Sequence, residues 1–471
     1  MRSREKCINW NFSKKPPALW INGSVYYVCE NSEPTAMLLS VLNAGGYLVQ
    51  LISKTTSKDD VDAGLNPIYF SKCVKHAIHS ILRNRELPNG GVQIDPITWG
   101  NFPLPLIQVN PPTIERTNEI VMSAYTNGIF SNSGELHQKA SSLLSKHVHR
   151  DFEGYLASSN TSALIACLLE IGVRGRHVLV SNFTFAATLH SIVLAGGIPV
   201  LCDVNSESLV MTLDTIRESL ENRDLDIAAV LPTRVLGFIT DFSELLEACA
   251  NRNIPVVIDA AGTFPDQNNV WAFKHQAKFE VFSLHATKVF GIGEGGLIVG
   301  KLDAIDSVKV RANFGIRTED PLHFQDGLNS KADEFTAARA LSRFPYYAID
   351  TNIRRSFTFK YKQVFEGSTQ IQLINDSTAT IYSFFPVIFD SELNLIKFMG
   401  LVNPFIRTRR YYFPSLNHGY SGNSKIITPT SLEISNSISR RILCLPVYVA
   451  CSNEVETQIM ELMASAKRSL S

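Results

Sequence analysis

The sequence predicts an α/β protein built on a mostly parallel sheet with helices on both faces. From about residue 152, short apolar runs rich in valine and isoleucine alternate with helical stretches of roughly 10–15 residues. Runs such as 177–182 and 254–261 are apolar on both faces, which indicates strands buried between two helical layers. In such sheets ligands bind at the carboxyl ends of the strands, so candidate site residues are sought there.

The elements follow one another in strict alternation. The predicted strands cover 154–160, 177–182, 198–204, 227–233 and 254–261. The predicted helices that follow the first four of them cover 161–172, 185–197, 212–222 and 241–253. Each helical stretch carries apolar residues at helical spacing, and each strand is bounded by polar or glycine-rich segments.

Two further regions flank this core, so we expect three parts. Residues 1–100 form an extra α/β region of unknown role, with a strand–helix–strand unit over 25–53 and a helix over 71–85. A segment rich in proline and glycine, 86–105, predicts a linker. The large domain covers 101–350, and the mixed strand and helix pattern of 351–471 predicts a small C-terminal α+β domain.

Composition excludes several classes of partner. Lys+Arg and Asp+Glu are both 44, so no net charge draws the chain to nucleic acid or anionic lipid. No apolar run approaches the roughly 18 residues that span a membrane, and the N-terminus lacks the apolar core of a signal peptide. We therefore expect a cytoplasmic protein that binds neither nucleic acid nor membrane.

Metal binding is also not expected. The eight cysteines include no CxxC pair and read as buried thiols of a reducing compartment. The pairs His76/His79 and His147/His149 lack a neighbouring Cys, Asp or Glu ligand, so solvated helix faces are the favoured interpretation.

A single lysine, Lys288, stands between an apolar run and a glycine-rich turn in residues 282–300. Gly291, Gly293 and Gly296 have the spacing of a dinucleotide-binding motif, but they lead into a strand rather than a helix, so that interpretation is rejected. A lone loop lysine is most often simply solvated. Its meaning depends on the residues that accompany it.

Two other features make this lysine significant. Residues 157–164 place small polar residues where a strand turns into a helix, which predicts a phosphate cradle or an ordinary helix cap; they include Ser159, Asn160, Thr161 and Ser162. Asp259 ends an apolar strand, where a buried carboxylate needs a cation. A lysine, a strand-end aspartate and a phosphate cradle are what a pyridoxal 5'-phosphate site requires.

Five motifs extend this pattern, at 158–164, 182–188, 257–261, 283–296 and 327–341. In order and spacing the chain resembles the DegT-type (DegT/DnrJ/StrS) sugar aminotransferases over roughly residues 105 to 465. The resemblance implies the aspartate aminotransferase-like fold, type I of the pyridoxal phosphate-dependent transferases. It also implies amino transfer from an amino acid, expected to be glutamate, to a keto-deoxysugar linked to a nucleotide.

The resemblance also implies a role for each matching position. Lys288 would form the Schiff base with the cofactor and shuttle protons, and Asp259 would pair with the pyridine nitrogen. Phe185 would stack on the ring, while Thr161 and Ser283 would bind the phosphate. Asn329 matches a residue that reaches the phosphate of the neighbouring subunit, which implies a homodimer with shared sites.

Two positions depart from the family pattern. Three residues after the aspartate the family has Gln or His, which contacts the ring hydroxyl of the cofactor; here the residue is Gly262. A methionine of the family is replaced by Ala332. We expect water to fill the space beside Gly262, so that Gly262→Gln would restore the direct bond.

Two other functions fit the same fold. One is a non-catalytic sensor or regulator that binds pyridoxal phosphate, supported by Gly262 and by the unassigned first hundred residues. The other is a pyridoxal phosphate-dependent sugar dehydratase, but the resembling dehydratases have histidine where this chain has Lys288.

Overall fold

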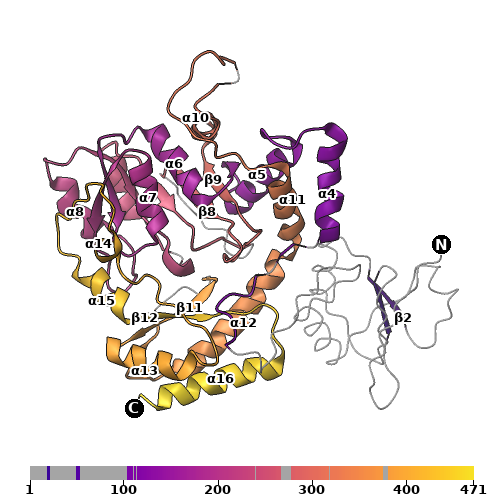
Figure 1. Cartoon of the computed structure of the whole chain (residues 1–471), viewed down its shortest axis with the longest axis vertical. Helices are drawn as coiled ribbons and strands as arrows, with labels where there is room; N and C mark the ends of the chain where they lie inside the picture. Colours follow the sequence, from indigo (N-terminus) through magenta and orange to yellow (C-terminus); the bar gives the residue numbers. More distant parts are fainter. Residues whose placement is uncertain are drawn as a thin grey trace. The chain divides into compact units, whose positions relative to one another are not determined.

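The computed structural model describes residues 18–21, 49–52, 103–109, 111–112, 114–238, 240–266, 277–317, 319–374 and 380–470. Contacts divide the chain into two units. One comprises 1–97 with the short segments 113–115 and 450–452, and the other comprises 98–112, 116–449 and 453–471. The strands and helices from α4 to α16 drawn in Figure 1 belong almost entirely to the second unit.

Within the first unit, β1 (Ala18–Ile21) pairs antiparallel with β2 (Val49–Ile52). The second of these strands falls inside the strand–helix–strand unit predicted over 25–53. The rest of that unit, the helix predicted over 71–85, and the pair His76/His79 lie outside the described residues. The three-part division of the chain stays a prediction.

The second unit is built on a seven-stranded sheet. Its strands are β3 (Glu153–Ala157), β4 (His177–Ser181), β5 (Ile198–Cys202), β6 (Ile227–Leu231), β7 (Val257–Asp259), β8 (Phe279–Ser283) and β9 (Gly296–Gly300). Strand pairing gives the order β3-β9-β8-β7 and β5-β4-β6, and parallel bridges from Val230 to Val256 and from Thr233 to Asp259 join β6 to β7. Only β9 runs antiparallel to the other six, which confirms the mostly parallel sheet.

Helices cover this sheet because its strands are apolar on both faces. They are α4 (Ile114–Asn127), α5 (Glu135–Val148), α6 (Asn160–Ile171), α7 (Ala186–Leu194), α8 (Leu213–Glu221), α9 (Ser243–Ala250), α10 (Leu302–Ala312) and α11 (Glu334–Arg343). The core packs the buried side of α6, including Leu164 and Leu168, together with Val180, Val281 and Ile298 of the strands.

Helix α11 anchors the start of α5. The residue before α5, Gly134, has no side chain to cap the helix. Instead the buried carboxylate of Glu334 accepts hydrogen bonds from the N–H groups of Leu136 (2.8 Å) and His137 (3.1 Å). This pairing fixes the segment that precedes β3 against the segment that follows the sheet.

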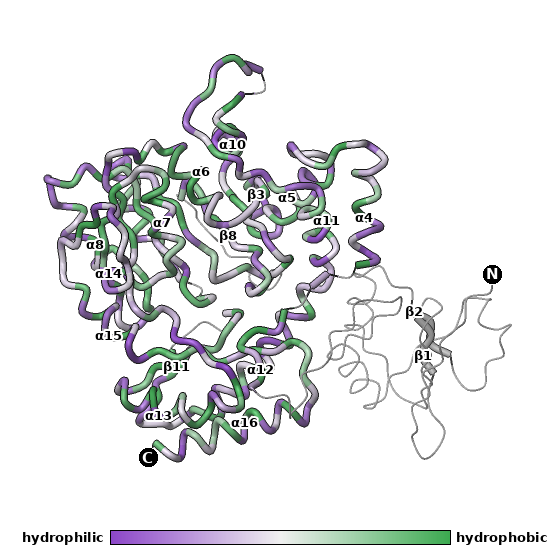
Figure 2. Tube along the Cα trace, viewed as in Figure 1, coloured by the Kyte–Doolittle hydropathy of each residue, from purple (hydrophilic) through white to green (hydrophobic). Residues whose placement is uncertain are grey.

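The part of the chain after α11, called the small domain below, combines a second sheet with helices. Its sheet is antiparallel, in the order β10 (Ile371–Gln372), β11 (Phe384–Phe389) and β12 (Ile442–Pro446). Its helices are α12 (Tyr347–Phe365), α13 (Glu392–Val402), α14 (Leu416–Gly419), α15 (Glu433–Arg441) and α16 (Asn453–Arg468). Figure 2 shows hydrophilic and hydrophobic residues alternating along α16, whose buried face packs on α12 and α13.

Three predictions can be compared with the described residues. The cysteines there are buried, as expected. No described helix is long and apolar enough to cross a membrane. The solvated setting expected for His147 is wrong: its ring stacks on Phe264 at 5.7 Å between centroids, and its Nε2 lies 2.9 Å from the carbonyl oxygen of Pro265.

Candidate active site

A cavity of about 340 Å³ lies at the carboxyl ends of the sheet strands. Parallel strands bring those ends together, so residues distant in sequence converge there. The predicted residues that line it are Ser159, Asn160, Thr161, Phe185, Asp259, Ser283 and Lys288. Residues of the small domain, including Arg409, Tyr411 and Tyr412, line it as well.

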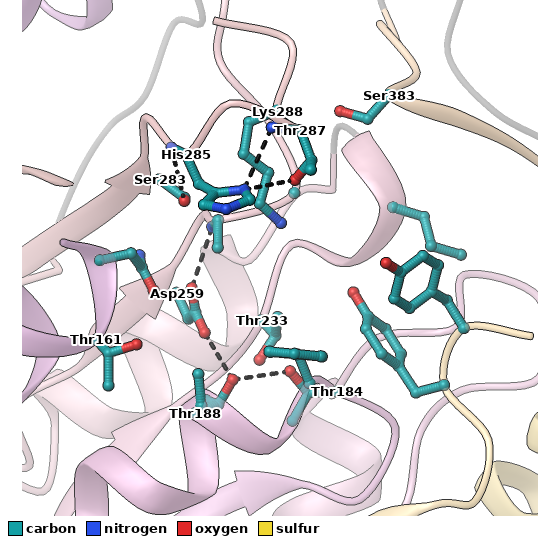
Figure 3. Close-up of a pocket in the computed structure, with 18 of the residues that line it drawn as sticks. Thr161, Thr184, Thr188, Thr233, Asp259, Ser283, His285, Thr287, Lys288 and Ser383 are labelled. Atoms are coloured by element: carbon teal, nitrogen blue, oxygen red, sulfur yellow. Dashed lines mark hydrogen bonds between the residues drawn. The ribbon is translucent and has the colours of Figure 1, made fainter. Parts of the chain in front are cut away.

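Lys288 lies in the turn between β8 and β9, and its side chain extends into the cavity (Figure 3). Burial lowers the pKa of its amine, and the negative charge of Asp259 opposes that shift. A lowered pKa increases the neutral fraction of the amine, which is the form that attacks a carbonyl carbon. This environment therefore suits a covalent role.

The glycine-rich turn after Lys288 is explained by a close approach of two backbones. A Cβ added to Gly296, the first residue of β9, would lie 2.5 Å from the carbonyl oxygen of Ser159. Only glycine lets the start of β9 pass so near the segment that leads into α6. The lysine turn and the predicted phosphate cradle can therefore line the same cavity.

Asp259 ends β7 and is 3% exposed. Its carboxylate accepts hydrogen bonds from the Thr188 hydroxyl (2.7 Å) and from the Ala261 N–H (3.1 Å), and Thr188 in turn lies 3.0 Å from the Thr184 hydroxyl (Figure 3). Burial raises the pKa of Asp259, whereas these hydrogen bonds and the charge of Lys288 lower it. The carboxylate is thus held in one orientation where a cation would stabilise its charged form.

The predicted phosphate cradle is the N-terminus of α6. Ser159 is the N-cap, and its hydroxyl accepts from the Ser162 N–H at 3.1 Å. The N–H groups of Asn160 and Thr161 belong to the first turn, which no intrahelical carbonyl can reach. Together with the Thr161 hydroxyl and the helix dipole, they suit an anion in the cavity.

Ser162, which was predicted among the phosphate ligands, does not line the cavity. Its hydroxyl donates to the Ser159 carbonyl (3.0 Å), accepts from Ser330 (2.8 Å) and contacts Ser158 (3.0 Å). The Ser162 hydroxyl also accepts from the Ser159 N–H at 3.2 Å, which completes the capping box, and the bond from Ser330 ties α6 to the segment before α11. Ser162 therefore supports the predicted phosphate cradle from outside the cavity.

Phe185 and Asn329 lie in different surroundings. Phe185 precedes α7, lines the cavity and is 52% exposed, so a face of its ring can receive a ligand. Asn329 is exposed and does not line the cavity of its own chain. Its predicted contact with a neighbouring subunit stays a prediction.

Gly262 lines the cavity, but backbone fills the place that a side chain would take there, so the direct bond expected from Gly262→Gln is wrong. The water expected beside Gly262 stays a prediction. A Cβ at this position would lie 2.7 Å from the Arg234 carbonyl oxygen and 3.0 Å from the Leu236 N. The backbone of residues 234–237 turns tightly there, with positive φ at Leu236 (56°) and Gly237 (97°). Backbone occupies the place that a side chain would need, so Gly262→Gln would clash before it could restore a bond.

Several lining residues were not predicted. Thr188, in α7, donates to Asp259, and Thr184, which precedes α7, contacts the Thr188 hydroxyl. Both lie in the motif over 182–188, which was a signal that could have found them. Thr233 follows β6 and pairs with Asp259 across the sheet. Arg409 and Ser383 come from the small domain, and no sequence pattern places them beside the large domain.

The cavity fits the cofactor that the sequence suggested. It holds an amine, a buried carboxylate and a helix N-terminus, and its volume lies within the range of small-molecule sites. Hydroxyls of Thr233 and Ser383 line it, buried and without a hydrogen-bond partner among the described residues. Buried hydroxyls of this kind indicate that a polar ligand completes the site.

This cavity, at the carboxyl ends of a seven-stranded sheet with one antiparallel strand, and the family match given next identify an enzyme of the aspartate aminotransferase-like fold that uses pyridoxal phosphate. A model of the DegT/DnrJ/EryC1/StrS aminotransferase family matches residues 112–464. The chain belongs to this family, and it is an aminotransferase.

Individual relatives span most of the chain. A dTDP-4-amino-4,6-dideoxy-D-glucose transaminase of Shigella dysenteriae is 27% identical over 374 residues, which are 78% of this chain and 99% of the relative. A 3-oxo-glucose-6-phosphate:glutamate aminotransferase of Bacillus subtilis (strain 168) is 23% identical over 348 residues, 70% of this chain and 75% of the relative.

Among solved structures, NtdA from Bacillus subtilis with bound cofactor PMP has the same fold, with a TM-score of 0.68 and 19% identity. The match covers 92% of this chain and 97% of NtdA.

Proposed function

We propose that this protein transfers an amino group from an amino acid, with glutamate as the donor, to a keto-deoxysugar that is linked to a nucleotide. The observation that carries the proposal is that Lys288 and Asp259 line one cavity, which shares residues with a second cavity of about 460 Å³. The two cavities share Thr184, Phe185, Arg409, Tyr411 and Tyr412. The nucleotide-linked substrate named for the Shigella dysenteriae relative suits a site of this length.

The second cavity has the chemistry that an anionic, aromatic ligand needs. Arg409 and Arg410 line it together with the rings of His190, Phe413 and Tyr420. Arg410 pairs with Glu392 at 2.6 Å. The Arg409 guanidinium lies over the Tyr411 ring, 4.7 Å from its centroid, and forms no ion pair with any residue that the structure describes. The Arg409 guanidinium can therefore bind a phosphate group, and the rings can stack on a base.

Each residue around the first cavity would have its own role in amino transfer. When bound, pyridoxal phosphate supplies an electron sink for the carbon that loses or gains the amino group. Lys288 would hold the cofactor covalently and move a proton at that carbon, and Asp259 would keep the pyridine nitrogen protonated. Thr161, Ser283 and the first turn of α6 would bind the phosphate, with Phe185 against the ring.

The proposed assembly is a cytoplasmic homodimer with shared active sites. Asn329 supports it, because this residue is exposed and lies outside the cavity of its own chain. An exposed amide at that position can donate to a phosphate held by a second copy. Residues 1–100 are proposed to form a separate region whose role we do not assign.

A second candidate substrate is a keto sugar phosphate without a nucleotide. The Bacillus subtilis relative, named as acting on 3-oxo-glucose 6-phosphate, favours it. Arg409 could bind a single phosphate as readily as a diphosphate. The two candidates differ in whether the second cavity is filled, and a substrate panel separates them.

The experiment follows the two half-reactions separately. Glutamate is expected to bleach the absorbance of the lysine-bound cofactor in the wild type, and the Lys288→Ala variant is the negative control. The bleached enzyme is then mixed with nucleotide-linked keto sugars and with keto sugar phosphates. Recovery of the absorbance only with the nucleotide-linked sugars supports the proposal, and recovery only with the phosphates supports the second candidate. Absence of bleaching by any amino acid would indicate a non-catalytic binding protein.

A further inference from the structure

Thr233 carries a buried hydroxyl that the protein itself leaves without a partner. The residue is 4% exposed and lines the same cavity as Lys288 and Asp259. Its Oγ1 makes no hydrogen bond to any described residue. Because an unpaired buried hydroxyl is costly, such a group inside a cofactor cavity indicates a contact that a ligand makes.

The strand order fixes the side of Asp259 on which Thr233 lies. Thr233 follows β6 and bridges to Asp259 at the end of β7. Ser283 ends β8, the neighbour of β7 on the opposite side, and Thr161 follows β3, which lies beyond β8 and β9. Asp259 therefore stands between the phosphate side of the site, marked by Ser283 and Thr161, and Thr233.

This order of phosphate side, Asp259 and Thr233 can be matched to the groups on the ring of pyridoxal phosphate. Its ring nitrogen and its reactive carbon lie across the ring from each other, with the phosphate arm on one edge and the ring hydroxyl on the other. If the nitrogen meets Asp259 and the phosphate lies near Thr161 and Ser283, the hydroxyl edge turns toward β6. Thr233 lies on that side and carries a hydroxyl with no partner among the described residues.

No side chain from position 262 can make this contact. The Arg234 carbonyl oxygen lies 2.7 Å from where a Cβ of residue 262 would be. The turn over 234–237 that fills this place begins directly after Thr233. The same piece of backbone thus excludes a side chain at 262 and presents Thr233 to the cavity.

We propose that the Thr233 hydroxyl donates a hydrogen bond to the ring oxygen of the cofactor. The donor draws negative charge from that oxygen, and this charge would otherwise stabilise a proton on the nitrogen that links the cofactor to Lys288. Thr233 therefore lowers the pKa of the linking nitrogen. The inference rests on the cofactor assignment and is independent of which sugar is the substrate.

The test is a pH titration of the absorbance of the lysine-bound cofactor. Thr233→Val keeps the shape of the side chain and removes the hydroxyl, so the titration midpoint should rise by about 0.5 to 1 unit. The dissociation constant of the cofactor should rise about three- to tenfold. Thr233→Ser, which keeps the hydroxyl, should titrate like the wild type.

Thr380→Val is the matched control. Thr380 is also 4% exposed and has no hydrogen-bond partner among the described residues, but it does not line the cavity. The titration midpoint of the lysine-bound cofactor in the Thr380→Val variant should equal that of the wild type. An unchanged midpoint in Thr233→Val, or an equal rise in Thr380→Val, would overturn the proposal. Because the readout needs only bound cofactor, a wrong sugar assignment leaves this result unaffected.

Discussion

At the scale of single residues, Asp259 shows how burial and function act on one group. Removal from water raises the pKa of its carboxyl, and the Thr188 hydroxyl, the Ala261 N–H and the charge of Lys288 oppose that shift. The net pKa is raised, so the folded protein binds this proton more tightly than the unfolded chain. The carboxyl therefore stabilises the cofactor-free protein most at low pH, and this contribution is lost as pH rises through the folded pKa.

Asp259→Asn should consequently separate activity from stability. We expect turnover to fall by orders of magnitude, because the pyridine nitrogen loses its counter-charge. The cofactor-free variant should gain stability relative to the wild type as pH increases from 4 to 8, measured by urea unfolding. Asp226→Asn is the control: Arg176 lowers the pKa of Asp226, so its trend should have the opposite sign. Turnover within about threefold of the wild type would assign the role to another residue.

Gly262 gives a second prediction at this scale. Gly262→Ala should destabilise the protein by about 1–3 kcal/mol, because its Cβ would press on the backbone of Arg234 and Leu236. Gly400→Ala is the control, since Gly400 lies in α13 with nothing within 4 Å of an added Cβ. That control should be neutral or slightly stabilising. Equal urea midpoints for wild type and Gly262→Ala would refute the close approach.

At the scale of elements, the N-terminus of α6 has two functions, and a different neighbouring residue carries out each of them. Ser159 and Ser162 satisfy each other in the capping box, and Ser330 joins them from the segment before α11. Thr161 has a different role, because it lines the cavity and takes no part in the capping box. Ser162 therefore supports the helix end, whereas Thr161 remains available to bind a ligand.

Ser162→Ala and Thr161→Val should therefore have different effects. Ser162→Ala should lower the free energy of unfolding by about 1 kcal/mol, as loss of a cap does, and change cofactor affinity little. Thr161→Val should weaken cofactor binding about tenfold, the effect of losing one charge-assisted hydrogen bond, and leave the cofactor-free stability nearly unchanged. Urea unfolding and a cofactor titration measure the two quantities. The reverse pattern would exchange the two roles.

At the scale of the whole molecule, the proposed dimer predicts complementation between two defective variants. Lys288→Ala lacks the reactive amine, and Asn329→Asp places a negative charge where the partner's phosphate is expected. Each homodimer should be nearly inactive. When the two are unfolded together and refolded, mixed dimers should regain one intact site, and activity should rise well above that of either parent. No recovery, with dimers present by sedimentation, would contradict shared sites.

The contact division of the chain motivates a second prediction at this scale. Since residues 1–97 form most of a separate unit, removal of residues 1–95 should leave a soluble protein with an unchanged cofactor spectrum. Size-exclusion chromatography and absorbance measure both properties. Aggregation of the shortened chain would contradict this prediction.

The sequence by itself determined the fold class and the main chemical groups, because both depend on local patterns. Alternating buried strands and amphipathic helices predict a parallel sheet, and such a sheet brings the strand-end residues Asp259 and Ser283 and the turn residue Lys288 together. The order of the motifs then indicated the family. None of this required knowledge of which side chains touch.

The tertiary structure alone decided how the remaining groups are used, because their roles depend on what lies opposite them in space. Ser162 and Thr161 are adjacent hydroxyl residues, and only the contacts of Ser162 show that it serves the helix cap. From the sequence, Gly262 suggests a missing side chain that could be put back, but the backbone of the turn over 234–237 occupies the place of that side chain. The sequence assigned no role to Thr233, and its significance comes from burial, from its cavity and from the absence of a partner among the described residues.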